Sequence, residues 1–126
     1  MTPLEEQFEK LREKHPEAAL QRNGDGSAMI TVPGIDLPEG WEPRTTKVFF
    51  LAPVGYPQGR PDCFWTDAQL RLNRDPRVPQ NTGQNPLPGG PVGLLWFSWH
   101  VQNWSPNNDT LLTYLNVIKK RFDDLR

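Results

Sequence analysis

Cys63 and His100 are the two residues of this sequence that we consider first for covalent or acid–base chemistry. Cys63 is the only cysteine of the chain, so it forms no internal disulfide and is either a core thiol or a reactive one. His100 can shuttle protons or bind a metal ion, because an imidazole titrates near neutral pH. For both residues, the neighbours in the sequence help to choose between a chemical and a structural role.

Cys63 follows Asp62 in the stretch "PDCFW". A neighbouring carboxylate raises the pKa of a thiol, whereas a reactive cysteine needs a lowered pKa. Free cysteines also pack more often as small buried hydrophobes than they act as nucleophiles. We therefore favour core packing for Cys63 and keep catalysis by its thiol as the alternative.

His100 has Ser98 two positions before it, where both side chains would project from the same face of a strand, and Asp109 follows. These three residue types suggest hydrolysis, but neighbours along one strand rarely aim their reactive atoms at each other, and no Gly-x-Ser-x-Gly elbow is present. We favour a structural role in which His100 hydrogen-bonds a loop carbonyl or Asp109. A single histidine without a cluster of ligating partners also predicts no metal site and no cofactor.

The segment "GLLWFSWHVQNWSP" contains three of the five tryptophans of the chain: Trp96, Trp99 and Trp104. We expect Trp99 and Trp104 to be core or half-buried anchors, since an indole buries a large apolar area. Trp96 either covers an apolar part of this segment or forms a binding surface with Phe97, because aromatic residues are enriched in interfaces. The sequence does not separate these two roles of Trp96.

Size and charge limit the classes of protein to which the chain can belong. Its 126 residues are about the size of one domain, so we expect a single domain over 1–126. The 14 basic and 15 acidic residues are mixed and leave a net charge of -1, which argues against nucleic-acid binding. No apolar run approaches a bilayer span, and the N-terminus is charged where a signal peptide is apolar. We therefore expect a soluble, cytoplasmic protein that does not enter a membrane.

The elements that must position these residues begin with a helix that ends at His15, before a proline. Thr2 as N-cap and Glu5 three residues later predict a capping box. One apolar stripe faces the core: Leu4, Phe8 and Leu11. Two strands about the Asn-Gly-Asp-Gly turn follow, and "TTKVFFLAP" adds a third.

Residues 53–91 contain most of the fourteen prolines and predict ordered loop with short strands. Within them, 76–91 orders either alone or on a partner. An amphipathic helix follows, with Asn107, Asn108 or Asp109 as its cap. Its apolar positions repeat at helical spacing: Leu111, Leu115, Ile118, Phe122 and Leu125. The predicted class is α+β, with an N-terminal helix, an antiparallel meander of about four strands, a long proline-rich irregular segment and a C-terminal helix.

This order of elements resembles the ubiquitin-conjugating (UBC) superfamily. That superfamily has Tyr-Pro-x-x-x-Pro after its third strand and Trp-x-Pro before a helix, and the residues that match are Tyr56, Pro57 and Pro61, then Gly93, Trp104, Ser105 and Pro106. The chain looks most like the prokaryotic family labelled E, with Pro-Asp-x-Phe and Ser-x-His before Trp-x-Pro and an Asp. The residues that match this pattern are Pro61, Asp62, Phe64, Ser98, His100, Trp104, Pro106 and Asp109. The resemblance covers nearly the whole chain and implies a UBC-like fold.

The sequence differs from the superfamily at the position of the catalytic cysteine. When Gly93 and Trp104 are aligned, the thioester cysteine is replaced by Trp96, and an indole cannot form a thioester. The family's His-Pro-Asn tripeptide is missing, and only Asn81 or Asn85 offers an amide there. The segment that resembles an active site therefore contains Gly93, Trp96, Ser98, His100, Trp104 and Asp109.

The resemblance implies partners from a bacterial conjugation system: a ubiquitin-like protein, an adenylating activating enzyme and a deconjugating peptidase. We favour a non-catalytic adaptor that binds the first two of these or an active conjugating partner. The superfamily commonly meets its activating enzyme through the first helix, whose charges can equally be a solvated face: Glu5, Glu6, Lys10 and Arg12. One alternative is a divergent conjugating enzyme that uses Cys63, or His100 as acid or base. Another is an interaction domain with no link to ubiquitin.

Overall fold

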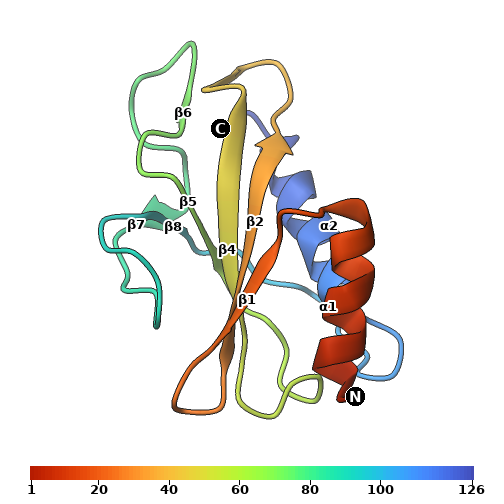
Figure 1. Ribbon diagram of the computed structural model, residues 1–126. Coiled ribbons are helices and arrows are strands. Elements are labelled where there is room, and N and C mark those ends of the chain that lie inside the picture. Colours follow the sequence, from red (N-terminus) through yellow and green to blue (C-terminus); the bar gives the residue numbers. More distant parts are fainter.

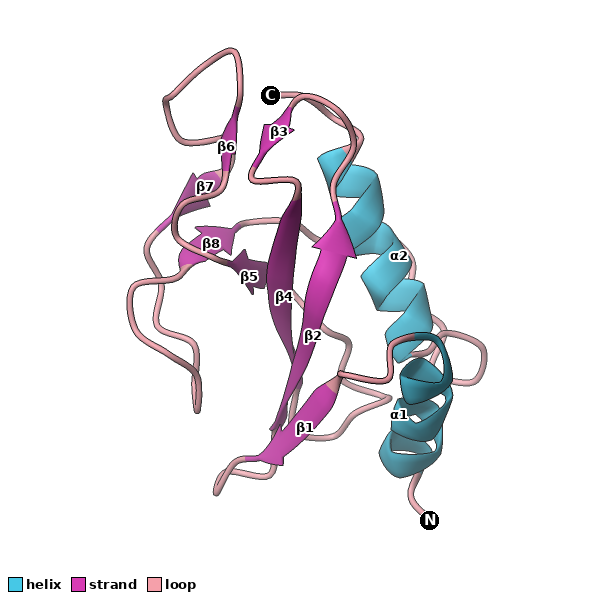
Figure 2. Ribbon diagram, turned by 45° about the horizontal axis from the view of Figure 1, so that its top comes forward, coloured by secondary structure: helices cyan, strands magenta, loops and turns pink.

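Two helices pack against one face of a twisted antiparallel sheet (Figure 1). The computed structural model describes all residues from 1 to 126. The helices are α1 (Pro3–Lys14) and α2 (Leu111–Phe122). The main sheet has six strands in the order β1 (Ala19–Arg22), β2 (Ala28–Asp36), β4 (Thr45–Ala52), β5 (Phe64–Thr66), β8 (Leu95–Phe97) and β7 (Thr82–Gly83). A separate two-stranded ribbon contains β3 (Trp41–Glu42) and β6 (Arg71–Leu72), seen at the top of Figure 2.

The predicted α+β class, with a helix at each end of a UBC-like antiparallel sheet, is confirmed. Strands β1, β2, β4 and β5 form the expected meander, each antiparallel to the next. The sheet continues into β8 and β7, which have three and two residues and are too short to show an alternating pattern in the sequence. Neither helix has the length and apolar content needed to cross a lipid bilayer.

Helix α1 begins and ends where the sequence predicted. The hydroxyl of Thr2 accepts a hydrogen bond from the Glu5 N–H at 3.1 Å, and the Glu5 carboxylate accepts one from the Thr2 N–H at 3.1 Å. His15 is the C-cap. The predicted apolar stripe packs in or against the core: Leu4, Phe8 and Leu11.

Side chains of the central strands alternate between the two faces of the sheet. Ile30 and Phe50 point toward the helices and belong to a core of 21 buried residues. The opposite face carries a second, smaller apolar cluster: Met29, Phe49, Trp65 and Leu87. The sheet is therefore covered on both faces, by helices on one and by an irregular segment on the other.

That irregular segment is the proline-rich stretch 76–91. The indole N–H of Trp65 donates to the carbonyl of Asn85 at 2.7 Å, and the Gln21 side-chain amide donates to the carbonyl of Gly89 at 2.9 Å. These bonds, together with the packing of the second cluster, hold the segment on the chain's own sheet.

Helix α2 has a different cap from those predicted, which were Asn107, Asn108 and Asp109. Thr110 has an extended backbone, and its hydroxyl accepts a hydrogen bond from the Thr113 N–H at 3.4 Å. Asp109 instead accepts a hydrogen bond from the Ser105 N–H at 2.6 Å and closes the turn before the helix. The prediction was wrong because Thr110 is also a favourable N-cap residue, and the helix begins directly after it and not after Asn107, Asn108 or Asp109.

The C-terminal end of α2 also departs from the predicted pattern. Leu125 lies beyond the helix and is 40% exposed, so its assignment to the apolar stripe was wrong. Arg121 is only 1% exposed. Its guanidinium donates hydrogen bonds to the carbonyls of Asp124 at 2.9 Å, Gln80 at 2.9 Å and Arg126 at 2.8 Å. The same group lies over three aromatic rings, those of Trp41, Phe97 and Trp99.

Candidate functional site

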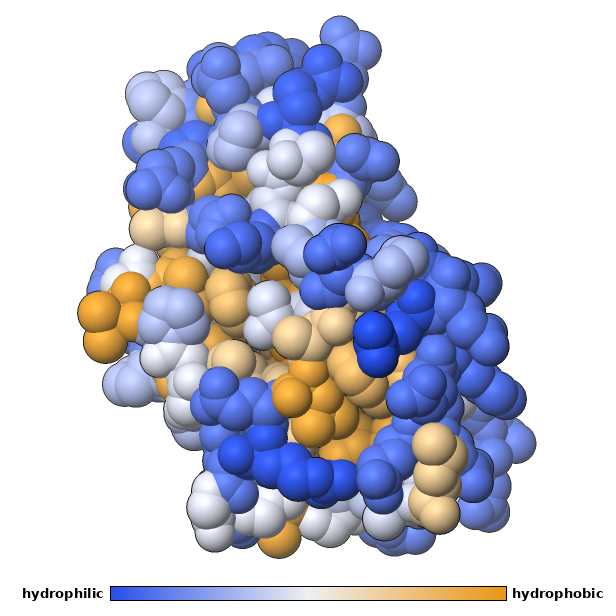
Figure 3. Space-filling view, viewed as in Figure 1, coloured by the Kyte–Doolittle hydropathy of each residue, from blue (hydrophilic) through white to orange (hydrophobic).

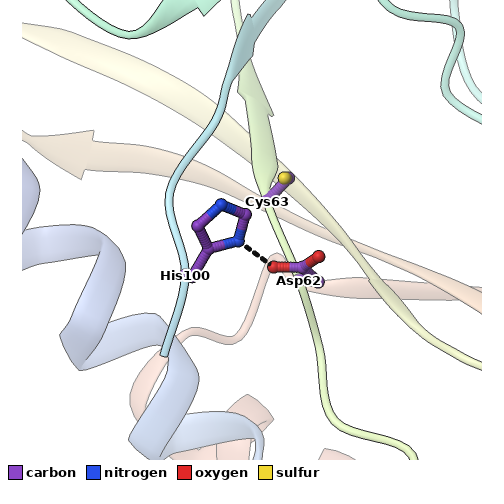
Figure 4. Close-up of side chains that lie close together, drawn as sticks. All are labelled: Asp62, Cys63 and His100. Atoms are coloured by element: carbon purple, nitrogen blue, oxygen red, sulfur yellow. Dashed lines mark hydrogen bonds and ion pairs between the residues drawn. The ribbon is translucent and has the colours of Figure 1, made fainter. Parts of the chain in front are cut away.

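Asp62, Cys63 and His100 lie together at one place on the molecule (Figure 4). One potential ligand atom from each of the three lies within 4.8 Å of the other two. Nδ1 of His100 hydrogen-bonds to the Asp62 carboxylate. Asp62 and Cys63 directly precede β5 and His100 follows β8, and these two strands are antiparallel neighbours. The beginning of one strand therefore lies beside the end of the other.

A buried tyrosine on α2 ties the two segments together. The hydroxyl of Tyr114 donates to the carbonyl of Cys63 at 2.7 Å and lies 3.4 Å from the carbonyl of Trp99. The N–H of Cys63 donates to the same Trp99 carbonyl at 3.0 Å. Burial raises the pKa of Tyr114, so its hydroxyl remains a donor. Sequence reasoning did not assign this role to Tyr114, whose only signal was its position on the apolar side of α2.

The backbone of Cys63 is in the left-handed region, with a φ of 63°. This conformation costs a non-glycine residue roughly 1–2 kcal/mol. Successive side chains in an extended strand point to opposite faces, and a left-handed residue interrupts that alternation. The Asp62 carboxylate is turned toward the His100 ring, and the Cys63 thiol lies close to both residues (Figure 4).

The structure corrects the expectation that Cys63 packs in the core. Cys63 is only partly buried and belongs to neither apolar cluster. Partial burial raises the pKa of its thiol, and the Asp62 charge acts in the same direction, as the sequence suggested. Hydrogen bonds involving Trp99 and Trp96 act in the opposite direction without cancelling the rise in pKa.

The expected partners of His100 were also wrong. Its ring contacts Asp62 and not a loop carbonyl or Asp109, and 58% of its side chain is exposed. Ser98 lies beyond the end of β8, and its hydroxyl makes no hydrogen bond to His100. The arrangement therefore contains no serine–histidine–aspartate unit. The prediction that His100 has no cluster of potential metal ligands around it was wrong too, because Asp62 and Cys63 come from a distant part of the chain.

Trp96 lies in β8, directly opposite Trp65 of β5. Its half-buried ring packs against the second apolar cluster and lies near Gly83 of β7. Gly93, the other end of the aligned segment, has a φ of 80° just before β8. Asn81 uses its main-chain carbonyl to accept a hydrogen bond from the Ser98 N–H, at 2.8 Å.

The two short motifs that carried the resemblance contact each other. The indole N–H of Trp104 donates to the carbonyl of Pro57 at 2.8 Å, and its ring centroid lies 6.0 Å from that of Tyr56. The hydroxyl of Tyr56 bonds to the side-chain oxygen of Gln7, which also accepts a hydrogen bond from the Leu111 N–H at 3.1 Å. The expectation that Trp104 is a half-buried anchor is confirmed. Gln7 joins α1, the start of α2 and the loop after β4.

The charged residues predicted on the first helix differ in their surroundings. Glu6, Lys10 and Arg12 are exposed, whereas Glu5 takes part in the capping box and lies 3.8 Å from Arg22. The helical side of the molecule is mainly hydrophilic (Figure 3). A partner that docks on α1 would therefore meet mostly charged and polar side chains.

Comparison with known families identifies the family of the chain. The family described as "Prokaryotic E2 family E" matches residues 6–124, which is nearly the whole chain and includes both motifs and the Asp62–Cys63–His100 cluster. No curated protein and no solved structure gives a significant match.

Proposed function

From the finding that the chain belongs to prokaryotic E2 family E, we propose that it is a non-catalytic adaptor of a bacterial ubiquitin-like conjugation system. Membership of an E2-like family implies interaction with ubiquitin-like proteins and their processing enzymes. It argues against the third interpretation, an interaction domain unrelated to ubiquitin.

The adaptor proposal is supported by the alignment of Gly93 and Trp104 with the superfamily, in which Trp96, an aromatic packing residue of β8, stands where the thioester cysteine would be. Thioester transfer needs a thiolate nucleophile and a donor that stabilises the oxyanion. Trp96 supplies no thiolate, and its ring packs against the second apolar cluster. The thiol of Cys63 has a raised pKa, which leaves less of the reactive thiolate at neutral pH.

The proposed docking element for the activating enzyme or the ubiquitin-like protein is the exposed face of α1. Glu6, Lys10 and Arg12 provide charges of both signs there, and charges at the rim of an interface mainly set partner choice and association rate. The adaptor would hold one component of the pathway while an active conjugating enzyme performs the transfer.

The first test measures transfer. The protein is incubated with the activating enzyme of its system, ATP and the ubiquitin-like protein, and the products are separated with and without reductant. We expect no reducible conjugate on this chain. A reducible conjugate that disappears in Cys63→Ala would overturn the adaptor proposal.

The second test measures binding. Titration calorimetry should detect binding of the activating enzyme or the ubiquitin-like protein, and the double variant K10E/R12E should weaken it. The variant R44E/K47E changes the charge by the same amount at exposed positions near β4 and should leave binding intact. Equal losses in both variants would show that α1 is not the docking face.

A divergent conjugating enzyme remains the second candidate, because the only thiol of the chain lies beside His100 and Asp62. In that reaction, the Cys63 thiolate would attack the activating enzyme's thioester, and the enzyme's own thiolate would leave. His100 would take the proton of the attacking thiol. This candidate predicts the Cys63-dependent conjugate that the adaptor proposal excludes, so the transfer assay separates the two.

A further inference from the structure

We propose that Asp62, Cys63 and His100 bind one divalent transition-metal ion, with Zn²⁺ as the best fit to these ligands. This site goes beyond the adaptor function and does not depend on it. Neither the family match nor the resemblance to conjugating enzymes assigns a metal to the chain.

The chemistry of the three donors favours zinc. A thiolate sulfur, an imidazole nitrogen and a carboxylate oxygen are the three ligand types that zinc uses in proteins, whereas Mg²⁺ and Ca²⁺ prefer oxygen alone. Metal–ligand bonds of about 2.0–2.3 Å place the ligand atoms of a tetrahedral site roughly 3–4 Å apart. The three atoms here already lie within 4.8 Å of one another. An ion held by both Asp62 and Nδ1 of His100 would replace the hydrogen bond between these two residues.

The backbone holds the ligands in place before a metal arrives. Cys63 is fixed through both of its main-chain groups, because its N–H donates to Trp99 and its carbonyl accepts from Tyr114. His100 directly follows Trp99, whose carbonyl belongs to the same network. The backbone of Cys63 has a left-handed φ of 63°, and these two hydrogen bonds hold it in that conformation. A fixed set of ligands lowers the conformational entropy lost on binding.

The site is also accessible and incomplete. The side chains of Asp62 and His100 are 60% and 58% exposed, so an ion can enter without opening the fold. Three protein ligands leave the fourth tetrahedral position for water or for a group from a partner. A bound ion would take the thiolate of Cys63, so the loaded protein would not use Cys63 as a nucleophile.

Cobalt substitution tests the site directly, because a cysteine thiolate bound to Co²⁺ gives a charge-transfer absorption in the near ultraviolet. Titration of the purified, metal-free chain with Co²⁺ should produce this absorption and saturate at one ion per chain, and Zn²⁺ should displace the cobalt. Absence of the absorption in the unmutated chain would overturn the proposal.

Variants then identify the ligands. Cys63→Ser should abolish the absorption. Asp62→Asn and His100→Ala should each weaken cobalt binding by roughly 100-fold or more, because each removes a ligand, and loss of a residue that only hydrogen-bonds a ligand costs about 10–100-fold. The matched controls are His15→Gln, which changes the only other histidine, and Asp36→Asn, which changes an exposed carboxylate on β2. Binding that depends equally on His15 would overturn the assignment.

Alkylation of the unmutated chain provides a measurement that does not depend on the folding of any variant. Zn²⁺ should slow the reaction of Cys63 with iodoacetamide, and a chelator should restore the original rate. An alkylation rate that does not change with saturating Zn²⁺ would also overturn the proposal.

Discussion

The hydroxyl of Tyr114 donates a hydrogen bond to the main-chain carbonyl of Cys63 across 2.7 Å, which joins the buried side of α2 to the residue directly before β5. The helix thus determines where the thiol lies. The side chains of Asp62 and His100, which lie beside this hydrogen-bonded backbone, are more than half exposed to solvent.

Tyr114→Phe removes this donor and retains the ring, which packs 5.2 Å from Phe50. We expect the free energy of unfolding to fall by about 1–3 kcal/mol, because the carbonyl of Cys63 loses a buried partner. Chemical denaturation measures the change. Alkylation of Cys63 in the native protein should also become faster, and an unchanged rate would mean that the hydroxyl does not hold this segment.

Cys63→Gly and Cys63→Ala differ only in a Cβ atom at a residue with a φ of 63°. Glycine normally weakens a strand, but here it should be the more stable variant by about 1 kcal/mol, because it adopts a left-handed backbone without strain. The denaturation midpoints of the two variants show which of them is more stable. A more stable alanine variant would contradict the strain assigned to this position.

Trp65→Phe and Trp104→Phe each remove one indole N–H that holds a loop. The first binds the carbonyl of Asn85, and the second binds that of Pro57. Each should cost about 1 kcal/mol. Limited proteolysis should distinguish them, because Trp65→Phe frees the carbonyl of Asn85 whereas Trp104→Phe frees that of Pro57. New cleavage in the same loop for both variants would contradict these assignments.

Arg121→Lys keeps the charge but loses the planar group that reaches three carbonyls. We expect it to destabilise the protein by about 2–3 kcal/mol, because buried acceptors lose charged donors. The neighbouring exposed residue gives the control: Lys120→Met should stay within about 0.5 kcal/mol of the unmutated protein. Similar values for both variants would mean that the buried contacts of Arg121 add little.

The capping box of α1 predicts a dependence on pH. Hydrogen bonds from Thr2 lower the pKa of Glu5 below its ordinary value of 4.5. A carboxyl with a lowered folded pKa contributes stability above its unfolded pKa, and this contribution disappears as the pH falls through the folded pKa. Melting temperatures of the unmutated protein and Glu5→Gln should therefore differ near neutral pH and converge in acid. A difference that is constant down to acid pH would contradict this role of Glu5.

The parts of the fold that depend on local sequence were predictable. The α1 cap requires only Thr2 and Glu5, which are three residues apart, and the apolar stripe of α2 is visible at helical spacing. The cap of α2 was not predictable, because four adjacent residues from 107 to 110 all suit a cap and only the backbone of Thr110 decides.

The candidate site depends on contacts that sequence spacing does not encode. Asp62 and His100 are 38 residues apart and meet through the pairing of two three-residue strands. The left-handed backbone of Cys63 has no signature in the sequence, since glycine or asparagine is the usual residue there. The buried Arg121 was missed for a related reason: its partners are main-chain carbonyls, which every residue has.

The hydrogen bonds of the Gln7 side-chain oxygen link the position of α1 to that of α2. This one atom accepts hydrogen bonds from the Tyr56 hydroxyl and from the first N–H of α2, and α2 in turn holds Cys63 through Tyr114. A partner that moves α1 away from this position would also break the hydrogen bond between Gln7 and the first N–H of α2. Gln7 therefore connects α1 to the start of α2, and Tyr114 connects α2 to the cluster of Asp62, Cys63 and His100.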